Sequence, residues 1–280
     1  MMKYLIMENS RFNKIKRFLY RLICVPRCGG CGERLSPLLR ENKLNLGKIC
    51  LCEKCLSDWQ SAKAQLCHRC GNIAGNCTCI PPKKSLNQQI IPSLFFYHPD
   101  SGRAENRIIY TVKHQNNREL FEFLTKELCP HINKLLSENG IPLEECVFTY
   151  IPRSKKGISK NGFDQGKRLC EKICRELGTS SMLTLFRRIG GREQKKLDKS
   201  ERKKNVESSL SLINSYSKKD KIINYEIATK LDGKTVIIID DIITTGESFS
   251  RCAKLLGDTY AKRTLFCCVA RCEIAGKTKK

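Results

Sequence analysis

Residues 236–248 read Val-Ile-Ile-Ile-Asp-Asp-Ile-Ile-Thr-Thr-Gly-Glu-Ser, and this stretch decides the fold. Four β-branched apolar residues in a row predict a strand buried on both faces of a parallel sheet. Asp240 and Asp241 end that strand, a Thr-Thr-Gly turn follows, and a helix begins at Glu247. Open α/β sheets bind ligands at the carboxyl ends of their strands, and a glycine turn before a helix offers N–H groups to a phosphate. The stretch therefore predicts a site for a phosphorylated ligand whose other polar groups meet carboxylates.

A simpler interpretation of the same residues is a buried strand followed by an ordinary helix cap. Asp241 or Thr245 would then accept a hydrogen bond from the first turn of the helix. A cap needs only one of these side chains and leaves the second aspartate and the Thr-Thr-Gly turn unexplained. We therefore favour the ligand site and keep the cap as the alternative.

The length and composition predict one large and one small folded unit. The chain has 280 residues, of which 40% are hydrophobic, enough for a buried core. It has no run of 18 apolar residues, so no transmembrane helix is expected. Residues 1–6 lack the organisation of a signal peptide, so we expect a cytoplasmic protein.

The formal net charge is +24. If eight cysteines ligate two zinc ions as thiolates, the charge falls only to about +20. Such a charge favours anionic partners, among them nucleic acid, phosphorylated metabolites and acidic membrane surfaces. The alternative is a lysine-rich surface that is merely solvated, because basicity alone names no partner.

Cysteines are concentrated near the N-terminus, where ten of the 18 lie between Cys24 and Cys79. In a chain without an export signal, close cysteine pairs predict metal ligands rather than disulfides. Four thiolates per ion and no open position indicate structural zinc. Cys50 is an alternative to Cys52, and the short Cys77-x-Cys79 spacing leaves the zinc count at one or two. The preferred sets are Cys28/Cys31 with Cys52/Cys55, and Cys67/Cys70 with Cys77/Cys79.

Composition divides the chain into three parts. Residues 1–25 contain a basic amphipathic helix at 9–23, which we expect to pack on its own protein rather than on a membrane or partner. Residues 26–82 form the cysteine-rich ribbon, with Trp59 expected to pack beneath it. A proline- and lysine-containing linker leads to an α/β domain at 90–275.

Within the α/β domain, the hydrophobic patterns predict alternating strands and helices. Pro130 should kink or divide the second helix. Two stretches are strongly basic. The turn Pro152-Arg153-Ser154-Lys155-Lys156-Gly157 is suited to bind a second anion, and its alternative is a solvated loop. Residues 187–204 are typical of a mobile segment outside the core, and their alternative is a solvated helix face. The expected strands are 94–97, 146–151, 208–213, 236–239 and 264–270, and the expected helices are 103–115, 118–137, 162–177 and 247–256.

The loop at 240–248 resembles the phosphoribosyl-diphosphate (PRPP) loop of type I phosphoribosyltransferases, and the whole order of parts resembles the ComF family. Besides that loop and the cysteine pairs, the resemblance rests on Ile151-Pro152, on Gly162-Phe163-Asp164-Gln165, and on Gln194, Glu201, Arg202 and Asn205. The chain departs from the family's Arg-Gly-Phe-Asn-Gln segment at Asn161 and Asp164, which removes a cation and replaces an amide by an acid.

The resemblance implies a mostly parallel, phosphoribosyltransferase type I-like sheet flanked by helices, with a small N-terminal double zinc ribbon. It implies that the aspartates face the ribose hydroxyls of PRPP and that the loop holds the 5′-phosphate. The basic turn would line the diphosphate together with Mg²⁺, and 187–204 would cover the site. The implied PRPP-binding residues are Asp240, Asp241, Thr244, Thr245, Gly246, Glu247, Ser248, Pro152, Arg153 and Ser154.

The function implied by the resemblance is PRPP binding in DNA uptake or single-stranded DNA handling, with single-stranded DNA or DNA-uptake proteins as partners. The first alternative is an active phosphoribosyltransferase of nucleotide or cofactor salvage, which displaces pyrophosphate with the help of Mg²⁺. The second is a PRPP-sensing regulator that binds without turnover. We can assign neither a general base nor a nucleobase pocket, so the loop argues for binding better than for catalysis.

Overall fold

The computed structural model describes most of the α/β region and the cysteine pairs. The predicted helix at 9–23, the linker and most of the basic stretch 187–204 lie outside the described residues. In the part that is described, no helix has the length and apolar character needed to cross a membrane. The described residues are 27–35, 50–77, 79, 93–98, 102–188, 209–213, 227–257, 259 and 261–272.

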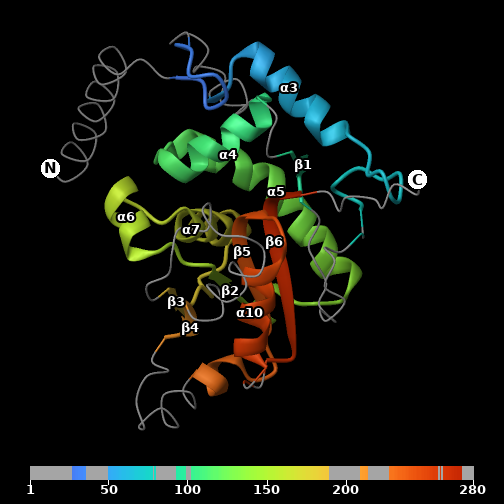
Figure 1. The fold of residues 1–280 in the computed structure, drawn as a ribbon. Helices are drawn as coiled ribbons and strands as arrows, with labels where there is room; N and C mark the ends of the chain where they lie inside the picture. Colours follow the sequence, from blue (N-terminus) through green and yellow to red (C-terminus); the bar gives the residue numbers. More distant parts are fainter. Residues whose placement is uncertain are drawn as a thin grey trace, which may run out of the picture.

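The centre of the molecule is a parallel sheet in the order β1-β6-β5-β2 (Figure 1). Its strands are β1 (Phe95–Tyr97), β2 (Cys146–Tyr150), β5 (Thr235–Ile243) and β6 (Arg263–Cys272). The two central strands are buried almost throughout, as expected for a parallel sheet covered on both faces. The predicted parallel α/β fold is therefore confirmed.

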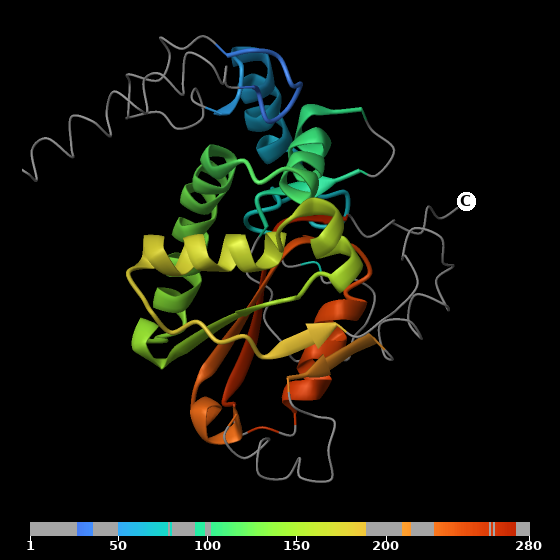
Figure 2. The ribbon, with the colours of Figure 1, turned by 90° about the vertical axis from the view of Figure 1, so that its left-hand side faces the viewer.

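Alternate residues of the strands point into two separate cores, as the period of two requires. Ile237 and Ile239 pack with helices α4 (Ala104–His114), α5 (Arg118–Glu138) and α7 (Gln165–Leu177). Val236 and Ile238 pack on the other face with α10 (Glu247–Leu256) and the β3–β4 hairpin (Figure 2). The hairpin pairs Phe186–Arg188 with Leu210–Leu212 in antiparallel register. The remaining elements are α3 (Glu53–Ala64), η2 (Leu143–Glu145) and α6 (Lys155–Asn161).

One local expectation was wrong, and a second was wrong in one of its two alternatives. Strand β5 does not end at the aspartates, because Asp240 pairs with Cys268 and Ile243 with Arg271 in register with β6. Continued pairing with β6 keeps the chain extended through both carboxylates. Pro130 does not divide α5, which runs unbroken. Pro130 lies on the exposed side of the helix, where the carbonyl group left without an N–H partner can bond to water.

The basic turn after β2 is also shorter than expected. Only residues 152–154 form a loop, because α6 begins at Lys155. The Ser154 hydroxyl caps this helix by accepting a hydrogen bond from the Gly157 N–H at 3.1 Å. The lysines of the turn therefore lie on a short helix, and Pro152 and Arg153 remain in the loop.

The cysteine-rich segment shares a core with the α/β domain. Trp59 of α3 is fully buried, and its ring lies 5.2 Å from Phe95 and 5.5 Å from Phe123 between centroids. Its indole N–H also donates to Glu127 Oε2 at 3.3 Å. Helix α3 lies beside α4 (Figure 1). Trp59 thus packs into the core of the large domain as well as beneath the cysteines.

Candidate functional site

The turn between β5 and α10 leaves the N-terminus of the helix without a side-chain cap. Gly246 occupies the N-cap position with φ of 75°, a left-handed conformation that favours glycine. Among the residues that the structure describes, no side chain accepts a hydrogen bond there, so neither Asp241 nor Thr245 acts as the cap. The positive end of the helix dipole at this turn favours an anion. The cap interpretation was therefore wrong.

The two aspartates lie beside this turn in different environments. Asp241 is 3% exposed, and its Oδ2 lies 3.7 Å from Lys113 Nζ. Among the described residues, this oxygen accepts no hydrogen bond. Asp240 Oδ1 accepts the Asp241 N–H at 2.8 Å. Burial, reinforced by the charge of Asp241, raises the pKa of Asp240 well above its usual value.

Lys113 balances the acidic pair, a role that no local sequence pattern indicated. Burial acts to lower the pKa of its amine, but the charges of Asp241 and Asp240 outweigh it, and the pKa is raised. In the sequence it is only a basic residue near the end of a predicted helix. Its separation from Asp241 along the chain left no local pattern that would have joined the two.

Arg153 lies over the same edge of the sheet. Its Nη2 donates to the Lys113 carbonyl at 2.5 Å, and its guanidinium lies 5.8 Å from the centre of the Phe163 ring. Burial lowers the pKa of Arg153, and the charges of Asp241 and Asp164 oppose that shift. Its Nη1 is buried without a hydrogen-bond partner in the described part of the chain. A buried donor and a buried acceptor, Asp241 Oδ2, thus both lack hydrogen-bond partners at this edge, as expected where a polar ligand binds.

Arg188, at the end of β3, adds a third cation. Its Nε donates to the Pro152 carbonyl at 3.1 Å, and its charge acts on Asp240. We predicted Arg188 only as part of the basic stretch 187–204, and strand β3 was not expected. The hairpin fixes it beside the predicted site loop.

The two departures from the ComF pattern have structural contacts of their own. Asp164 caps α7 by accepting from the Lys167 N–H at 3.1 Å, and it also accepts the Arg153 N–H at 2.7 Å. Asn161 Oδ1 lies 3.1 Å from His114 Nδ1 and so joins α6 to α4. The acid at 164 therefore holds the loop that carries Arg153.

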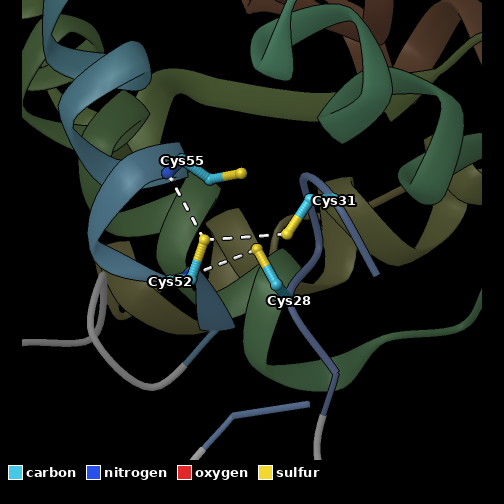
Figure 3. Close-up of side chains that lie close together, drawn as sticks. All are labelled: Cys28, Cys31, Cys52 and Cys55. Atoms are coloured by element: carbon cyan, nitrogen blue, oxygen red, sulfur yellow. Dashed lines mark hydrogen bonds between the residues drawn. The ribbon is translucent and has the colours of Figure 1, made fainter. Parts of the chain in front are cut away.

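The structure brings the predicted cysteine sets together as two clusters: cluster 1 (Cys28, Cys31, Cys52, Cys55) and cluster 2 (Cys67, Cys70, Cys77, Cys79). In each cluster the four sulfurs lie within 4.8 Å of one another. Cys31 and Cys52 Sγ are 3.6 Å apart (Figure 3), and Cys70 and Cys77 Sγ are 3.4 Å apart. Zinc bound tetrahedrally by thiolates separates the sulfurs by about 3.8 Å. Both clusters could therefore hold zinc.

Backbone N–H groups point at the sulfurs of cluster 1. Cys28 Sγ accepts from Cys52 N–H at 3.2 Å and from Gly30 N–H at 3.4 Å. Burial acts to raise the pKa of Cys28, but the N–H groups of Cys31, Cys52 and Gly30 outweigh it and lower the pKa. Gly30 is required here because a Cβ would lie 2.7 Å from Cys55 Sγ. Cys50 is not part of this cluster, so its exchange for Cys52 is not supported.

Cluster 2 contains a thiol that ionises readily. The N–H of Asn72 lowers the pKa of Cys70 to about 7. Protons and a metal ion compete for a thiolate, and a thiol that is already partly ionised near neutral pH loses its proton more readily when the metal binds. Burial raises the pKa of Cys77 to about 12, so the proximity of the four sulfurs is what makes this cluster fit a metal ion despite its short Cys77-x-Cys79 spacing.

Comparison with known proteins supports the phosphoribosyltransferase-type part of the chain. Residues 189–279 match the phosphoribosyl transferase domain family. The chain is also similar to the DNA utilization protein YhgH of Salmonella typhi, with 22% identity over 214 residues, which are 75% of this chain and 85% of that protein. The predicted combination of a cysteine-rich N-terminal region and a phosphoribosyltransferase-type domain is confirmed, and it supports the resemblance to the ComF family.

Proposed function

We propose that this ComF-like chain binds PRPP with Mg²⁺ at the carboxyl edge of β5 and takes part in handling single-stranded DNA. One observation carries the first half of the proposal. The uncapped N-terminus of α10 lies next to two aspartates, and Lys113, Arg153 and Arg188 interact with that pair or with the adjoining loop. Groups that bind an anion lie here close to carboxylates, and this combination matches a sugar phosphate better than a simple anion.

The parts of PRPP have different chemistries, and the proposed site divides accordingly. The N–H groups of residues 245–248 suit the 5′-phosphate. The carboxylates of Asp240 and Asp241 suit the ribose hydroxyls, which are donors. Arg153 suits the diphosphate, because its Nη1 is buried and lacks a hydrogen-bond partner among the described residues. Mg²⁺, when bound, would neutralise part of the diphosphate charge. A carboxylate oxygen such as Asp241 Oδ2 is the type of ligand that Mg²⁺ prefers.

Titration calorimetry tests this site with PRPP and Mg²⁺, compared with ribose 5-phosphate and pyrophosphate. We expect Arg153→Met to weaken PRPP binding about tenfold or more, because a hydrogen bond to a charged group is lost. Binding of ribose 5-phosphate should change little. Arg175→Met, on the exposed end of α7, is the matched control and should bind PRPP like the wild type.

Two results would contradict the proposal: no PRPP heat from the wild type, or equal weakening of PRPP and ribose 5-phosphate by Arg153→Met. Release of pyrophosphate on addition of a nucleobase panel would show turnover and favour the salvage alternative. Binding without release favours a binding or sensing role.

The second half of the proposal concerns nucleic acid. The relative's name refers to DNA utilization, and the net charge of +24 favours a polyanion. Lys155, Lys156 and Lys160 are exposed on α6. Tyr110 is 58% exposed and lies 4.3 Å from His114 between ring centroids, and His114 contacts the end of α6. Lysines beside an exposed aromatic ring suit the backbone and bases of a single strand.

Fluorescence anisotropy with labelled single-stranded DNA over a salt series tests this surface. Replacing the three α6 lysines by glutamine should weaken binding and reduce the log–log salt slope by about 2, since each phosphate contact contributes roughly 0.7. Replacing Lys126 and Lys134, which are exposed on α5, should have less than half that effect. A protein that binds no DNA at low salt would remove the nucleic-acid role.

A further inference from the structure

Cluster 2 is attached to the central sheet through one buried arginine. Arg271, near the end of β6, is only 3% exposed. Its Nη2 donates to the Cys77 carbonyl at 2.8 Å and its Nη1 to the Cys79 carbonyl at 3.3 Å. The guanidinium lies 5.3 Å from the centre of the Phe96 ring, which packs against Cys67 and Cys77. Arg271 therefore reaches the two ligand carbonyls from the sheet side of the cluster.

The charge of this guanidinium needs a partner. Within the described ranges, no carboxylate lies within 4.0 Å of Arg271. A cation that is removed from water without a counter-charge is costly, and two carbonyl groups and an aromatic face offset only part of that cost. Four thiolates around one Zn²⁺ carry a net charge of −2, and such a centre is stabilised by donors and cations around it.

We propose that Arg271 is the counter-charge of a tetrathiolate zinc centre in cluster 2 and a positioning residue for that centre. The inference rests on zinc in cluster 2 and is independent of PRPP. It also gives the cluster a defined place in the fold. Arg271 pairs with Ile243 in the sheet, and Ile243 directly precedes the turn that opens α10. The zinc centre is thereby fastened to the strand pair from which the proposed phosphate loop departs.

Cluster 1 offers an internal contrast. There Arg107 Nε donates to the Gly30 carbonyl at 2.8 Å, and Thr111 Oγ1 donates to the Gly29 carbonyl at 2.8 Å. Arg107 is exposed, so water screens its charge and can replace its hydrogen bond. Both clusters thus receive an arginine on the carbonyls of a cysteine turn, but only Arg271 is buried.

The test compares Arg271→Gln, Arg271→Lys and Arg107→Gln in the full chain purified with zinc. Zinc content is measured directly, and chelator-induced release is followed by N-ethylmaleimide labelling with peptide mapping, which reports each cysteine separately. In Arg271→Gln, which keeps hydrogen-bond donors but loses the charge, we expect the cluster 2 cysteines to be labelled about 10–100-fold faster. Arg271→Lys should lie between Arg271→Gln and wild type, and Arg107→Gln should leave both clusters near wild-type rates.

Three outcomes would overturn the inference. One is wild-type protein with no zinc in cluster 2. Another is a folded Arg271→Gln variant that is labelled at the wild-type rate. The third is equal loss of zinc from both clusters. If Arg271→Gln does not fold, Arg271→Lys is compared with Arg271→Met. If the charge is what matters, Arg271→Lys keeps zinc in cluster 2 better than Arg271→Met. If only the shape of the guanidinium matters, the two variants do not differ.

Discussion

Replacing Asp240 with asparagine should abolish PRPP binding and, at the same time, stabilise the unliganded fold. Burial and the neighbouring charge of Asp241 raise the pKa of Asp240, so its ionised form is less favourable in the folded than in the unfolded state. Asparagine has a similar shape without that charge. We expect Tm to rise by about 2–4 °C near neutral pH, the shift that ~1 kcal/mol produces in a domain of this size.

The pH dependence of this gain follows from the direction of the shift. As pH rises above the unfolded-state pKa, the carboxyl group ionises more easily in the unfolded chain than in the folded one. The raised pKa therefore lowers the stability of the folded state in that range. Below that pKa both states are protonated, so the advantage of asparagine should disappear as pH falls through it. Thermal melts over a pH series, together with PRPP calorimetry, measure both effects. Asp232→Asn, at an exposed position before β5, is the control and should change neither.

A variant that loses both stability and PRPP binding would contradict this prediction, because simple damage to the fold would then explain the binding defect. Unchanged PRPP binding would remove Asp240 from the proposed site. We expect the substitution to raise the stability of the fold and to abolish PRPP binding, because an unfavourable buried charge that serves a ligand destabilises the unliganded protein.

Removal of metal from cluster 1 should loosen the core of the large domain and be visible in tryptophan fluorescence. Trp59 is the single tryptophan of the chain. It lies on α3, the helix that begins beside Cys52 and contains Cys55. Because its ring packs on Phe95 and Phe123, loss of the metal should expose it. We expect a red-shifted emission and a Tm lower by about 10 °C or more, since structural zinc contributes directly to folding.

The matched variants are Cys31→Ser, which removes an exposed member of cluster 1, and Cys272→Ser, a half-buried cysteine outside both clusters. Only Cys31→Ser should reproduce the effect of chelation. Although the Cys31 residue is exposed overall, partial desolvation of its thiol and the neighbouring Cys28 and Cys52 sulfurs raise its pKa to about 11, so protons compete with the metal for this thiolate. Metal should therefore be lost as pH falls rather than as it rises. Unchanged emission and Tm after complete removal of zinc would show that cluster 1 does not support the core.

The local sequence patterns of this protein determined much of its fold. Four β-branched residues at 236–239 are buried on both faces of β5, and α10 begins at Glu247 as expected. The cysteine spacing predicted both groups of four sulfurs. Such features could be predicted because a run of β-branched residues, a glycine turn and a short chelating spacing each involve only neighbouring residues.

The partners of those features were decided only by the tertiary structure. Lys113 meets Asp241, Arg188 acts on Asp240, and Arg271 donates to the carbonyls of cluster 2. Trp59 enters a core formed by α5 and β1. Each contact joins residues far apart in the chain, and a buried cation has the same sequence signature as a solvated one. The sequence therefore predicted a phosphate loop and two thiolate clusters, whereas sheet register and helix packing determined which charges surround them.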